Sequence, residues 1–329
     1  IASFYRQPIL VPLTRAMSLL LAINSLAVVQ TAMLTRNVAF KLQAKVSLIS
    51  SLCSGSLGVV MAYRGYGVWS LVCQQISRGV LNVVLLWVFN RWRPGLVFSF
   101  RALRQMFTFG SRMLVSSLLD QVFHNIYSVL IGKMFSPSDL GYYDRAARTQ
   151  QLPSMTLTNV VTRVSLPVFS SIQDDNIRLK KGLQRILCLL MFLIAPVMVL
   201  LTVTASPLVT VLLTEKWLPC VPYLRVLCVL GILYPLHAVN LNILVAKGRS
   251  DLFLRLEMLK KGFILCNVLV SWRWGIMAII IGQIVTSCIS YFLNSYYSGK
   301  LLGYSARRQL CDMAVYLLPA VVVGTGVYA

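Results

Sequence analysis

The chain has 329 residues, of which 57% are hydrophobic and only 12% are charged, and its mean hydropathy is +0.75. A soluble domain is about 45–50% apolar and about 25% charged, so this composition excludes an ordinary soluble protein and indicates an all-α polytopic membrane protein. The net charge of +22 would suggest nucleic-acid binding in a soluble protein, but here Lys and Arg are spread over the segments between apolar runs.

Apolar runs alternate with polar connections along the whole chain. Each spanning helix requires about 20 mostly apolar residues, and the runs fit nine helices and the start of a tenth. Proline begins or bends several of them, which a membrane bundle tolerates where neighbouring helices satisfy the freed backbone groups. The predicted helices cover residues 8–35, 44–62, 67–89, 108–134, 139–170, 182–213, 218–246, 250–272 and 274–299, and the last begins at 308.

Basic residues are distributed unequally between the connections. Short cytoplasmic loops carry the excess of Lys and Arg, so the richer set of alternate connections is predicted to face the cytoplasm. Seventeen lie in or beside that set: Arg36, Lys41, Lys45, Arg91, Arg93, Arg101, Arg104, Arg178, Lys180, Lys181, Arg185, Lys247, Arg249, Arg255, Lys300, Arg307 and Arg308. The other set holds five: Arg6, Arg64, Lys133, Lys216 and Arg273.

Two short strings recur in the same order at nearly one offset. Residues 12–15 (PLTR) match 222–225 (PYLR) at an offset of 210, and 67–75 (GVWSLVCQQ) resemble 275–283 (GIMAIIIGQ) at an offset of 208. The offset spans six helices, so the two copies have the same orientation, as in the parallel repeats of transporters. The helices at 108–213 then have partners upstream, which predicts about 100 further N-terminal residues, in keeping with a chain that starts at Ile1.

Nine basic residues fall inside predicted helices, where a charge at mid-bilayer costs about 2.5–3.5 kcal/mol on insertion scales. Arg112 and Arg163 lie near helix ends, so their side chains can extend to the interface. Glu257 precedes Lys260 by three residues and Lys261 by four, which favours a pair within the helix. The full set is Arg15, Arg78, Arg112, Arg145, Arg148, Arg163, Arg225, Lys260 and Lys261.

The stretch 140–153 (LGYYDRAARTQQLP) is the most polar part of a predicted span. Arg145, Arg148 and Gln151 follow one another at spacings of three and therefore form one polar face. Asp144 is expected to reach Arg148 at the i+4 position, leaving Arg145 without a local partner. Arginines that converge inside a bundle suit an anion, most naturally phosphate, because guanidinium binds phosphate bidentately. The candidate substrate-binding residues are Arg145, Arg148, Gln151, Arg15, Arg225 and Arg78, and the alternative for each is pairing or extension to the interface without a ligand.

Other functional classes receive little support from the sequence. The eight cysteines form no CxxC pair and the two histidines show no metal-ligand spacing, so no metal or cofactor is expected. Walker A, GxSxG and HExxH strings do not occur, and the outer connections are too short for an external catalytic domain. The sequence therefore favours a secondary transporter of a large anionic substrate rather than an enzyme.

Several strings together resemble the Wzx-type polysaccharide flippases, in their WzxC-like branch, of the MOP (multidrug/oligosaccharidyl-lipid/polysaccharide) superfamily. The strings run in order through almost the whole chain: 34–41 (LTRNVAFK), 66–72 (YGVWSLV), 130–133 (LIGK), 140–146 (LGYYDRA), 151–153 (QLP), 169–175 (FSSIQDD), 215–219 (EKWLP) and 246–249 (AKGR). The resemblance implies a two-lobe bundle of roughly 12–14 helices, about 10 of them present here. By this resemblance, residues 1–89 are the last three helices of the first lobe, 90–107 a cytoplasmic linker, 108–299 the second lobe and 300–329 the start of extra helices.

The resemblance also implies a function. Proteins of this kind are thought to flip undecaprenyl-pyrophosphate-linked oligosaccharide across the bacterial inner membrane by alternating access, for O-antigen, lipopolysaccharide or exopolysaccharide export. The expected partners are that lipid-linked oligosaccharide, membrane lipids and the polysaccharide polymerase and export machinery. Alternatives are a related exporter of lipid II or of drugs, and a membrane-embedded polysaccharide polymerase or ligase. A cationic-drug exporter would require carboxylates rather than arginines in its cavity.

One position departs from the family pattern. The family often has an acidic residue just before the Leu-Ile-Gly string, where this chain has Tyr127. Asp120 lies seven positions earlier on roughly the same helical face, so Asp120 and Asp144 are the candidate ion-coupling residues. Moving one charge through the membrane is worth about 2.3 kcal/mol per 100 mV, so either ion coupling or the membrane potential could drive transport.

Overall fold

The computed structural model describes residues 2–5, 7–36, 40–90, 99–100, 107, 111, 114, 118 and 121–328, and every element in this part of the chain is helical. The chain divides into two compact units, residues 1–113 and 114–329, which are described separately. The cytoplasmic linker predicted at 90–107 lies almost wholly outside the described residues. The lobe boundaries named above therefore stay predictions.

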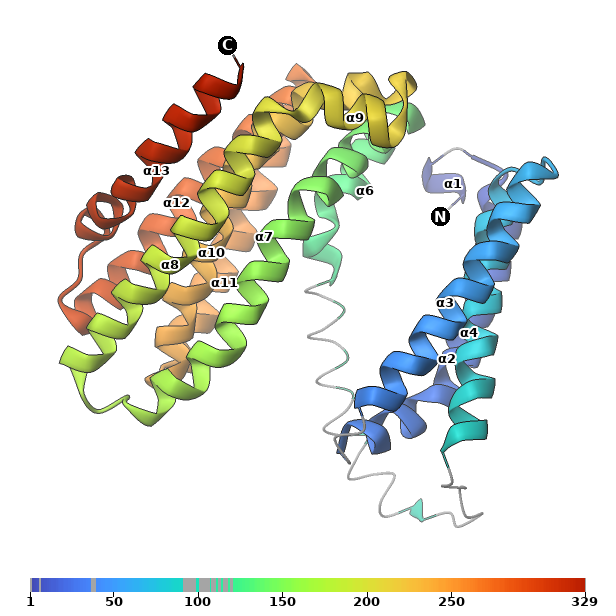
Figure 1. Cartoon of the computed structure of the whole chain (residues 1–329), viewed down its shortest axis with the longest axis horizontal. Helices are drawn as coiled ribbons and strands as arrows, with labels where there is room; N and C mark the ends of the chain where they lie inside the picture. The colour runs from blue at the N-terminus through green and yellow to red at the C-terminus, as the bar shows by residue number, and fades with distance from the viewer. Residues whose placement is uncertain are drawn as a thin grey trace. The chain divides into compact units, whose positions relative to one another are not determined.

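The first unit contains three long helices, one of which packs against both others, preceded by the short helix α1. Helix α4 contacts α2 and α3 extensively, whereas α2 and α3 touch little (Figure 1). Its small core contains Ala27, Leu34, Val46 and Leu86. The indole of Trp87 donates a hydrogen bond to the carbonyl of Leu26 (3.0 Å). The helices are α1 (Ala2–Tyr5), α2 (Leu10–Arg36), α3 (Phe40–Tyr63) and α4 (Val68–Phe89).

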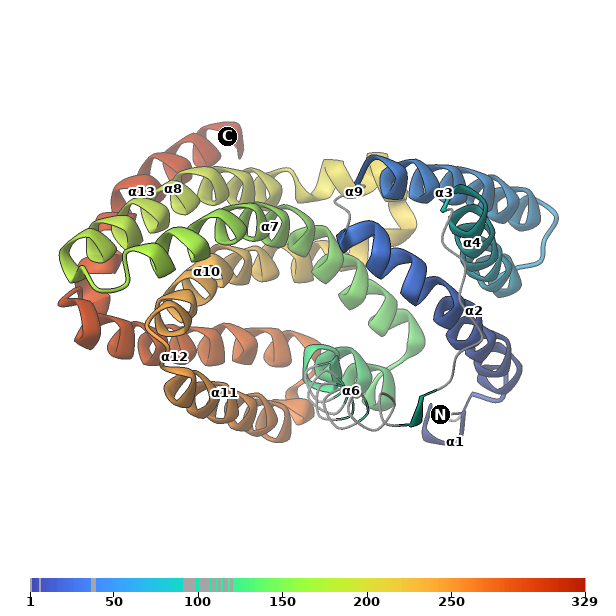
Figure 2. The same cartoon turned by 90° about the horizontal axis from the view of Figure 1, so that it is seen from below.

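The second unit is built around α10 (Val221–Ala246), which packs against α7, α8 and α12. Figure 2 shows α7 and α10 side by side, with α11 and α12 closing the other side of this unit. Its core is a continuous set of Leu, Ile, Met and Val side chains from these helices. The other elements are α6 (Ile126–Met134), α7 (Pro137–Ser171), α8 (Asn176–Val203), α9 (Ala205–Leu213), η1 (Glu215–Cys220), α11 (Ser250–Ser271), η2 (Trp272–Trp274), α12 (Ile276–Leu302) and α13 (Ala306–Tyr328).

Local capping explains where α7 and α8 begin. Ser136 forms a capping box with Asp139, and Pro137 occupies the first turn of α7, where its missing N–H costs nothing. Asp175 accepts hydrogen bonds from the backbone N–H groups of Ile177 and Arg178, so α8 begins at Asn176, six residues before the predicted start. The Arg178 backbone N–H is the largest cause that lowers the pKa of Asp175.

Two helix predictions require correction. The helix predicted at 182–213 is in fact two helices, because the backbone of Thr204 leaves the helical region (φ −85°, ψ 10°) between α8 and α9. Of the helix predicted at 108–134, Ile126–Met134 forms α6, and much of residues 108–120 lies outside the described part. The predicted pair of Glu257 and Lys260 is confirmed as a salt bridge within α11.

Six helical segments of the described chain are both long and apolar enough to span a membrane, which makes this a multi-pass membrane protein. Helices α7, α11 and α13 have 35, 22 and 23 residues, but charged side chains interrupt their apolar sequence. Length alone lets them cross a bilayer, and the interrupting charges include the predicted cationic face of α7. The six segments are 10–34, 41–63, 68–89, 176–203, 215–246 and 276–302.

Helix α13 is held to the second unit by buried polar side chains. Asn240 on α10 and Gln309 on α13 exchange amide hydrogen bonds of 3.1 and 3.3 Å, and both residues are fully buried. Ser298 on α12 donates to the Asn240 oxygen (2.5 Å). The hydroxyl of Tyr304 and the amide of Gln184 both donate to Asp312 (2.6 and 2.8 Å). Helices α8, α10, α12 and α13 are thus joined by hydrogen bonds as well as by apolar packing.

The repeat seen in the sequence corresponds to a repeated arrangement of helices. In α10–α11–α12, as in α2–α3–α4, the third helix packs against the other two, which contact each other little. Gly67 and Gly275, matched by the sequence, both occupy N-cap positions with positive φ (53° and 90°). The second and third helices also approach closely at matched positions: Gly58 lies against Gln74, and Gly282 lies against Asn267.

Replacement of Gly282 tests the tightest of these contacts. A Cβ atom there would lie 1.7 Å from Oδ1 of Asn267, whose amide is hydrogen-bonded to Tyr127 and to the carbonyl of Ile279. We expect Gly282→Ala to lower the free energy of unfolding by about 1–3 kcal/mol, measured as a lower thermal midpoint in detergent. The matched control is Gly262→Ala on α11, where an added Cβ meets nothing within 4 Å. Equal midpoints for the two variants would contradict the close packing.

Candidate anion-binding face

Arg145 and Arg148 lie together on the exposed side of α7. They follow Pro137 by eight and eleven residues, which places them about 12 and 17 Å along the helix from its start. Gln151 follows at the same spacing and is half-buried. The predicted polar stripe of Arg145, Arg148 and Gln151 therefore exists on α7, well inside the helix.

The opposite side of α7 is fixed to α10. The hydroxyl of Ser154 donates a hydrogen bond to the carbonyl of Gly231 (2.8 Å). A Cβ atom on Gly231 would lie 2.4 Å from the amide nitrogen of Gln150 and 2.5 Å from the sulfur of Met198, so only glycine allows this approach. Gln150 and Ser154 are buried against α10. Because Arg145 and Arg148 lie on the opposite side of α7, their side chains point away from the core of the second unit.

Arg145 has a partner in η1, far from it in the sequence. Its guanidinium lies over the ring of Trp217, 5.2 Å from the centroid, in a cation–π contact. Trp217, in η1, packs edge-on against Tyr142 at 5.9 Å. A cation–π contact of this kind uses the positive charge of the guanidinium rather than its N–H donors, which can still donate hydrogen bonds to an anion.

Asp144 does not pair with Arg148, so this expectation was wrong. The Asp144 carboxylate accepts a hydrogen bond from the hydroxyl of Ser128 on α6 (2.6 Å), and no salt bridge among the described residues joins it to Arg148. The Asp144 side chain is drawn toward α6 rather than along the exposed side of α7. This carboxylate therefore does not neutralise Arg148 on the predicted face.

The remaining candidate arginines fall into two groups. Arg225, on α10, is half-buried and lies six residues before Gly231, just as Arg148 lies six residues before Ser154. Helices α7 and α10 run parallel, since Tyr142 meets Trp217 and Ser154 meets Gly231 further along both, so Arg148 and Arg225 lie at similar heights. Arg15 and Arg78 belong to α2 and α4 of the first unit, and their convergence with the α7 arginines stays a prediction.

The position that departs from the family pattern lies in a neutral hydrogen-bonded cluster. The amide of Asn267 on α11 donates to the hydroxyl of Tyr127 (3.3 Å) and to the carbonyl of Ile279 (3.4 Å). The hydroxyl of Ser271 donates to the Asn267 side-chain oxygen (3.2 Å). Nearby, Gln283 on α12 donates to the hydroxyl of Tyr143 (3.0 Å). Tyr127 is thus part of an uncharged cluster that joins α6, α7, α11 and α12, and Asp120 lies outside the described residues.

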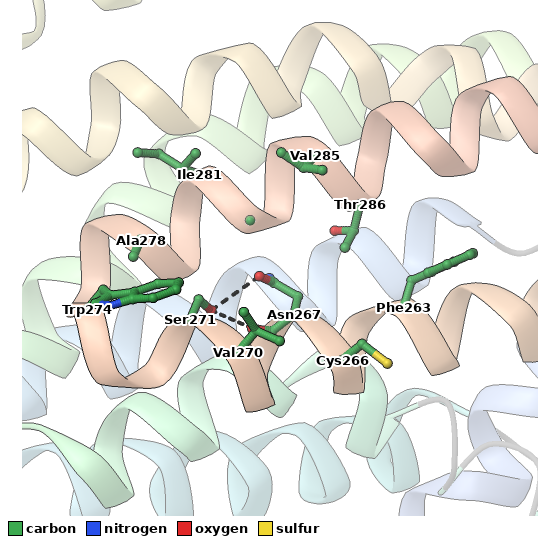
Figure 3. A pocket seen from close by; sticks show the side chains of 11 residues that line it. Phe263, Cys266, Asn267, Val270, Ser271, Trp274, Ala278, Ile281, Val285 and Thr286 are labelled. Carbon is green, nitrogen blue, oxygen red and sulfur yellow. Dashed lines mark hydrogen bonds between the residues drawn. The ribbon is translucent and has the colours of Figure 1, made fainter.

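A groove of about 440 Å³ opens beside this cluster, between α11 and α12 (Figure 3). Apolar side chains such as Phe263, Val270 and Val285 line most of it, and Asn267, Ser271 and Thr286 supply its polar atoms. The dashed lines in Figure 3 mark the two hydrogen bonds from Ser271 to Asn267. Its lining residues include no charged side chain, so the groove does not extend the cationic face of α7.

Sequence reasoning missed the partners that orient the site. Trp217 lies in the string 215–219 that carries the family resemblance, but nothing in the spacing connects it with Arg145, seventy-two residues earlier. Ser128 carries no signal of its own, because a serine in an apolar helix usually bonds to its own backbone. Both contacts become visible only when η1 and α6 are packed against α7.

Comparisons with known proteins agree with this architecture. A model of the family described as "Polysaccharide biosynthesis protein" matches residues 1–222. Teichuronic acid biosynthesis protein TuaB of Bacillus subtilis is 29% identical over 254 residues, covering 77% of this chain and 53% of TuaB. Lipopolysaccharide biosynthesis protein WzxC of Escherichia coli is 24% identical, covering 98% of this chain and 67% of WzxC. The chain thus spans about half of TuaB and two thirds of WzxC.

Solved structures include one with a similar fold. The lipid II flippase MurJ, in its inward closed conformation, aligns with 96% of this chain at a TM-score of 0.73 and 12% identity, and the alignment covers 72% of that structure. At this identity the likeness shows the fold alone. It agrees with the all-helical, MOP-type bundle that the sequence indicates.

Removal of the Ser128 hydroxyl tests the orientation of Asp144. We expect Ser128→Ala to lower the free energy of unfolding by about 1–3 kcal/mol, because the carboxylate loses its described hydrogen-bond donor inside the bundle. Thermal unfolding in detergent measures the loss. Ser171→Ala is the matched control, since that exposed hydroxyl bonds only to the Val168 carbonyl of its own helix. A Ser128→Ala midpoint equal to that of the control would show that the contact contributes nothing.

Proposed function

Since this chain belongs to the polysaccharide biosynthesis protein family, we propose that the whole protein flips undecaprenyl-pyrophosphate-linked oligosaccharide across the bacterial inner membrane by alternating access. The observation that carries the proposal is the cationic face of α7. Arg145 and Arg148 stand well inside a helix of a membrane bundle, and no described carboxylate forms a salt bridge with either. Charged residues inside membrane proteins face the bundle interior or a wet cavity and mark substrate pathways.

The chemistry of the face suits the pyrophosphate of a lipid carrier. Two guanidinium groups one helical turn apart can each donate two parallel hydrogen bonds to phosphate oxygens. The indole of Trp217 restricts the rotamers of Arg145, so less side-chain entropy is lost when an anion binds. We propose that the sugar chain lies on the exposed side of α7, in a water-filled cavity of the whole protein, while the lipid tail stays in the bilayer. Gln151 and the arginines at 15, 78 and 225 are proposed to contact the polar part of the same substrate.

Transport of this kind requires no chemical step. The protein must bind the headgroup on one side, move its lobes and release the headgroup on the other side, driven by an ion or by the membrane potential. Asp144 stays a candidate for ion coupling, with Ser128 as its hydrogen-bond donor, and Asp120 stays a second candidate. The polymerase and export machinery that act on the flipped glycan are the proposed functional partners.

Replacement of Arg148 tests the proposal directly. The complete gene should restore surface polysaccharide in a flippase-deficient strain, and the purified protein should flip lipid-linked oligosaccharide in proteoliposomes. Loss of a hydrogen bond to a charged group costs about 1.5–3 kcal/mol, so Arg148→Ala should slow flipping by about 10- to 100-fold. Arg255→Ala, an exposed arginine on α11, is the control and should flip normally. Normal flipping by Arg148→Ala would remove the α7 face from the mechanism.

Trp217 offers a graded test of the same face. Trp217→Phe keeps an aromatic ring near Arg145 and should flip almost as fast as the wild type, whereas Trp217→Leu should be slower by about two- to tenfold, in line with the strength of a cation–π contact. The same proteoliposome assay measures both. If the Trp217→Leu variant flips as fast as the Trp217→Phe variant, Trp217 contributes apolar packing rather than a cation–π contact with Arg145.

A further inference from the structure

A second polar site lies in the first unit. A cavity of about 330 Å³ opens between α2, α3 and α4. Its lining is mostly amide and hydroxyl side chains, with Arg78 as the one charged group among the residues that line it. The lining residues are Leu20, Asn24, Ser47, Ser50, Gln75, Arg78, Gly79 and Asn82.

The cavity lies at the middle of the membrane-spanning segments. Arg78 follows Val68 by ten residues and precedes Phe89 by eleven, so it is about 15 Å from either end of α4. An arginine near a helix end can extend to the interface, but the side chain is too short to do so from this depth. Gln75, Arg78 and Asn82 share one side of α4, so three polar side chains of this helix line the same cavity.

Part of the lining lacks a hydrogen-bond partner within the protein. Ser50 on α3 is 1% exposed, and its hydroxyl oxygen has no partner among the described residues. A buried hydroxyl without a partner is uncommon in native proteins and calls for a ligand or water that satisfies it. No salt bridge of the described chain involves Arg78. The cavity therefore offers hydrogen-bonding capacity that the three helices do not use among themselves.

The second copy of the repeat packs its helices in the same way without a cation at this position. At the offset of 208, Gln75 corresponds to Gln283, Arg78 to Thr286 and Asn82 to Ser290. In the second copy these side chains bond internally: Gln283 to Tyr143, Thr286 to the carbonyl of Gln283, and Ser290 to the carbonyl of Thr286. The same three-helix packing is thus built with a threonine where the first copy carries Arg78.

We propose that this cavity binds an acidic sugar residue of the transported glycan, with its single carboxylate on Arg78 and its hydroxyl groups on the surrounding amides and serines. The inference rests on the proposed function and names a substrate class for it. Amides and hydroxyls both donate and accept hydrogen bonds, as sugar hydroxyls require. One guanidinium matches one carboxylate bidentately, whereas a pyrophosphate, with more negative charge, suits the paired arginines of α7. A volume of about 330 Å³ lies in the range of small-molecule sites.

The test compares two lipid-linked oligosaccharides that differ in one group. One carries a uronic acid, and the other carries the same sugar with the carboxylate reduced to an alcohol. The complete protein in proteoliposomes should flip the acidic glycan about tenfold faster than the neutral one. Arg78→Thr, which copies the residue at the matching position of the second repeat, should abolish this preference, so that the variant flips the acidic and the neutral glycan at equal rates. Arg64→Thr, an exposed arginine in the connection before α4, is the control and should keep the preference.

The outcomes separate this inference from the proposed function. The acidic-sugar site is overturned if Arg78→Thr slows both glycans equally, or if the wild type flips both glycans at the same rate. Neither result contradicts the proposed flippase activity. If the wild type flips neither glycan, the proposed function fails. Calorimetric binding of free glucuronate to the purified protein then decides the site alone: binding that Arg78→Thr abolishes supports it, and no binding overturns it. Asn82→Ser, also copied from the second repeat, should weaken glucuronate binding severalfold and provides a second variant if Arg78→Thr unfolds.

Discussion

The close contact between α7 and α10 at Gly231 determines which side of α7 carries its exposed arginines, Arg145 and Arg148. Because Gly231 has no side chain, Gln150 and Ser154 fit against α10, and the hydroxyl of Ser154 donates a hydrogen bond to the Gly231 carbonyl. The helical period then leaves Arg145 and Arg148 on the exposed side. A membrane protein cannot leave polar groups unpaired in hydrocarbon, so the burial of one polar stripe and the exposure of another are two results of the same packing.

Much of the fold could be predicted because a membrane-spanning helix is determined mainly by the length and hydrophobicity of its own sequence segment. Apolar length, proline positions and the alternation of basic connections marked the helices, and their ends differ from the structure by a few residues at most positions. The break at Thr204 could not be predicted, since Val203, Thr204 and Ala205 continue an apolar run and only the backbone angles show the interruption. Helix α8 begins early because Asp175, which lies between the helices predicted at 139–170 and 182–213, caps its N-terminus.

The positively charged residues of the candidate site could be predicted from the sequence, but the side chains that contact the site could not. Arg145 and Arg148 stand out because charge is rare in such a helix, whatever surrounds them. The partner of Asp144 was predicted wrongly because an i+4 spacing makes a salt bridge with Arg148 possible but does not require it. Instead, the hydroxyl of Ser128, on another helix, donates a hydrogen bond of 2.6 Å to the Asp144 carboxylate. Trp217 could not be associated with Arg145 from sequence, because the contact depends on how η1 folds back beside α7.

The polar attachment of α13 has a mechanical consequence. In water, a helix held by amide hydrogen bonds can separate at modest cost, because solvent replaces the lost partners. In a bilayer no such replacement exists, so separating α13 would strand the amides of Asn240 and Gln309 in hydrocarbon. Helix α13 is therefore expected to move together with α8, α10 and α12, as one rigid body, in any conformational change of the second unit.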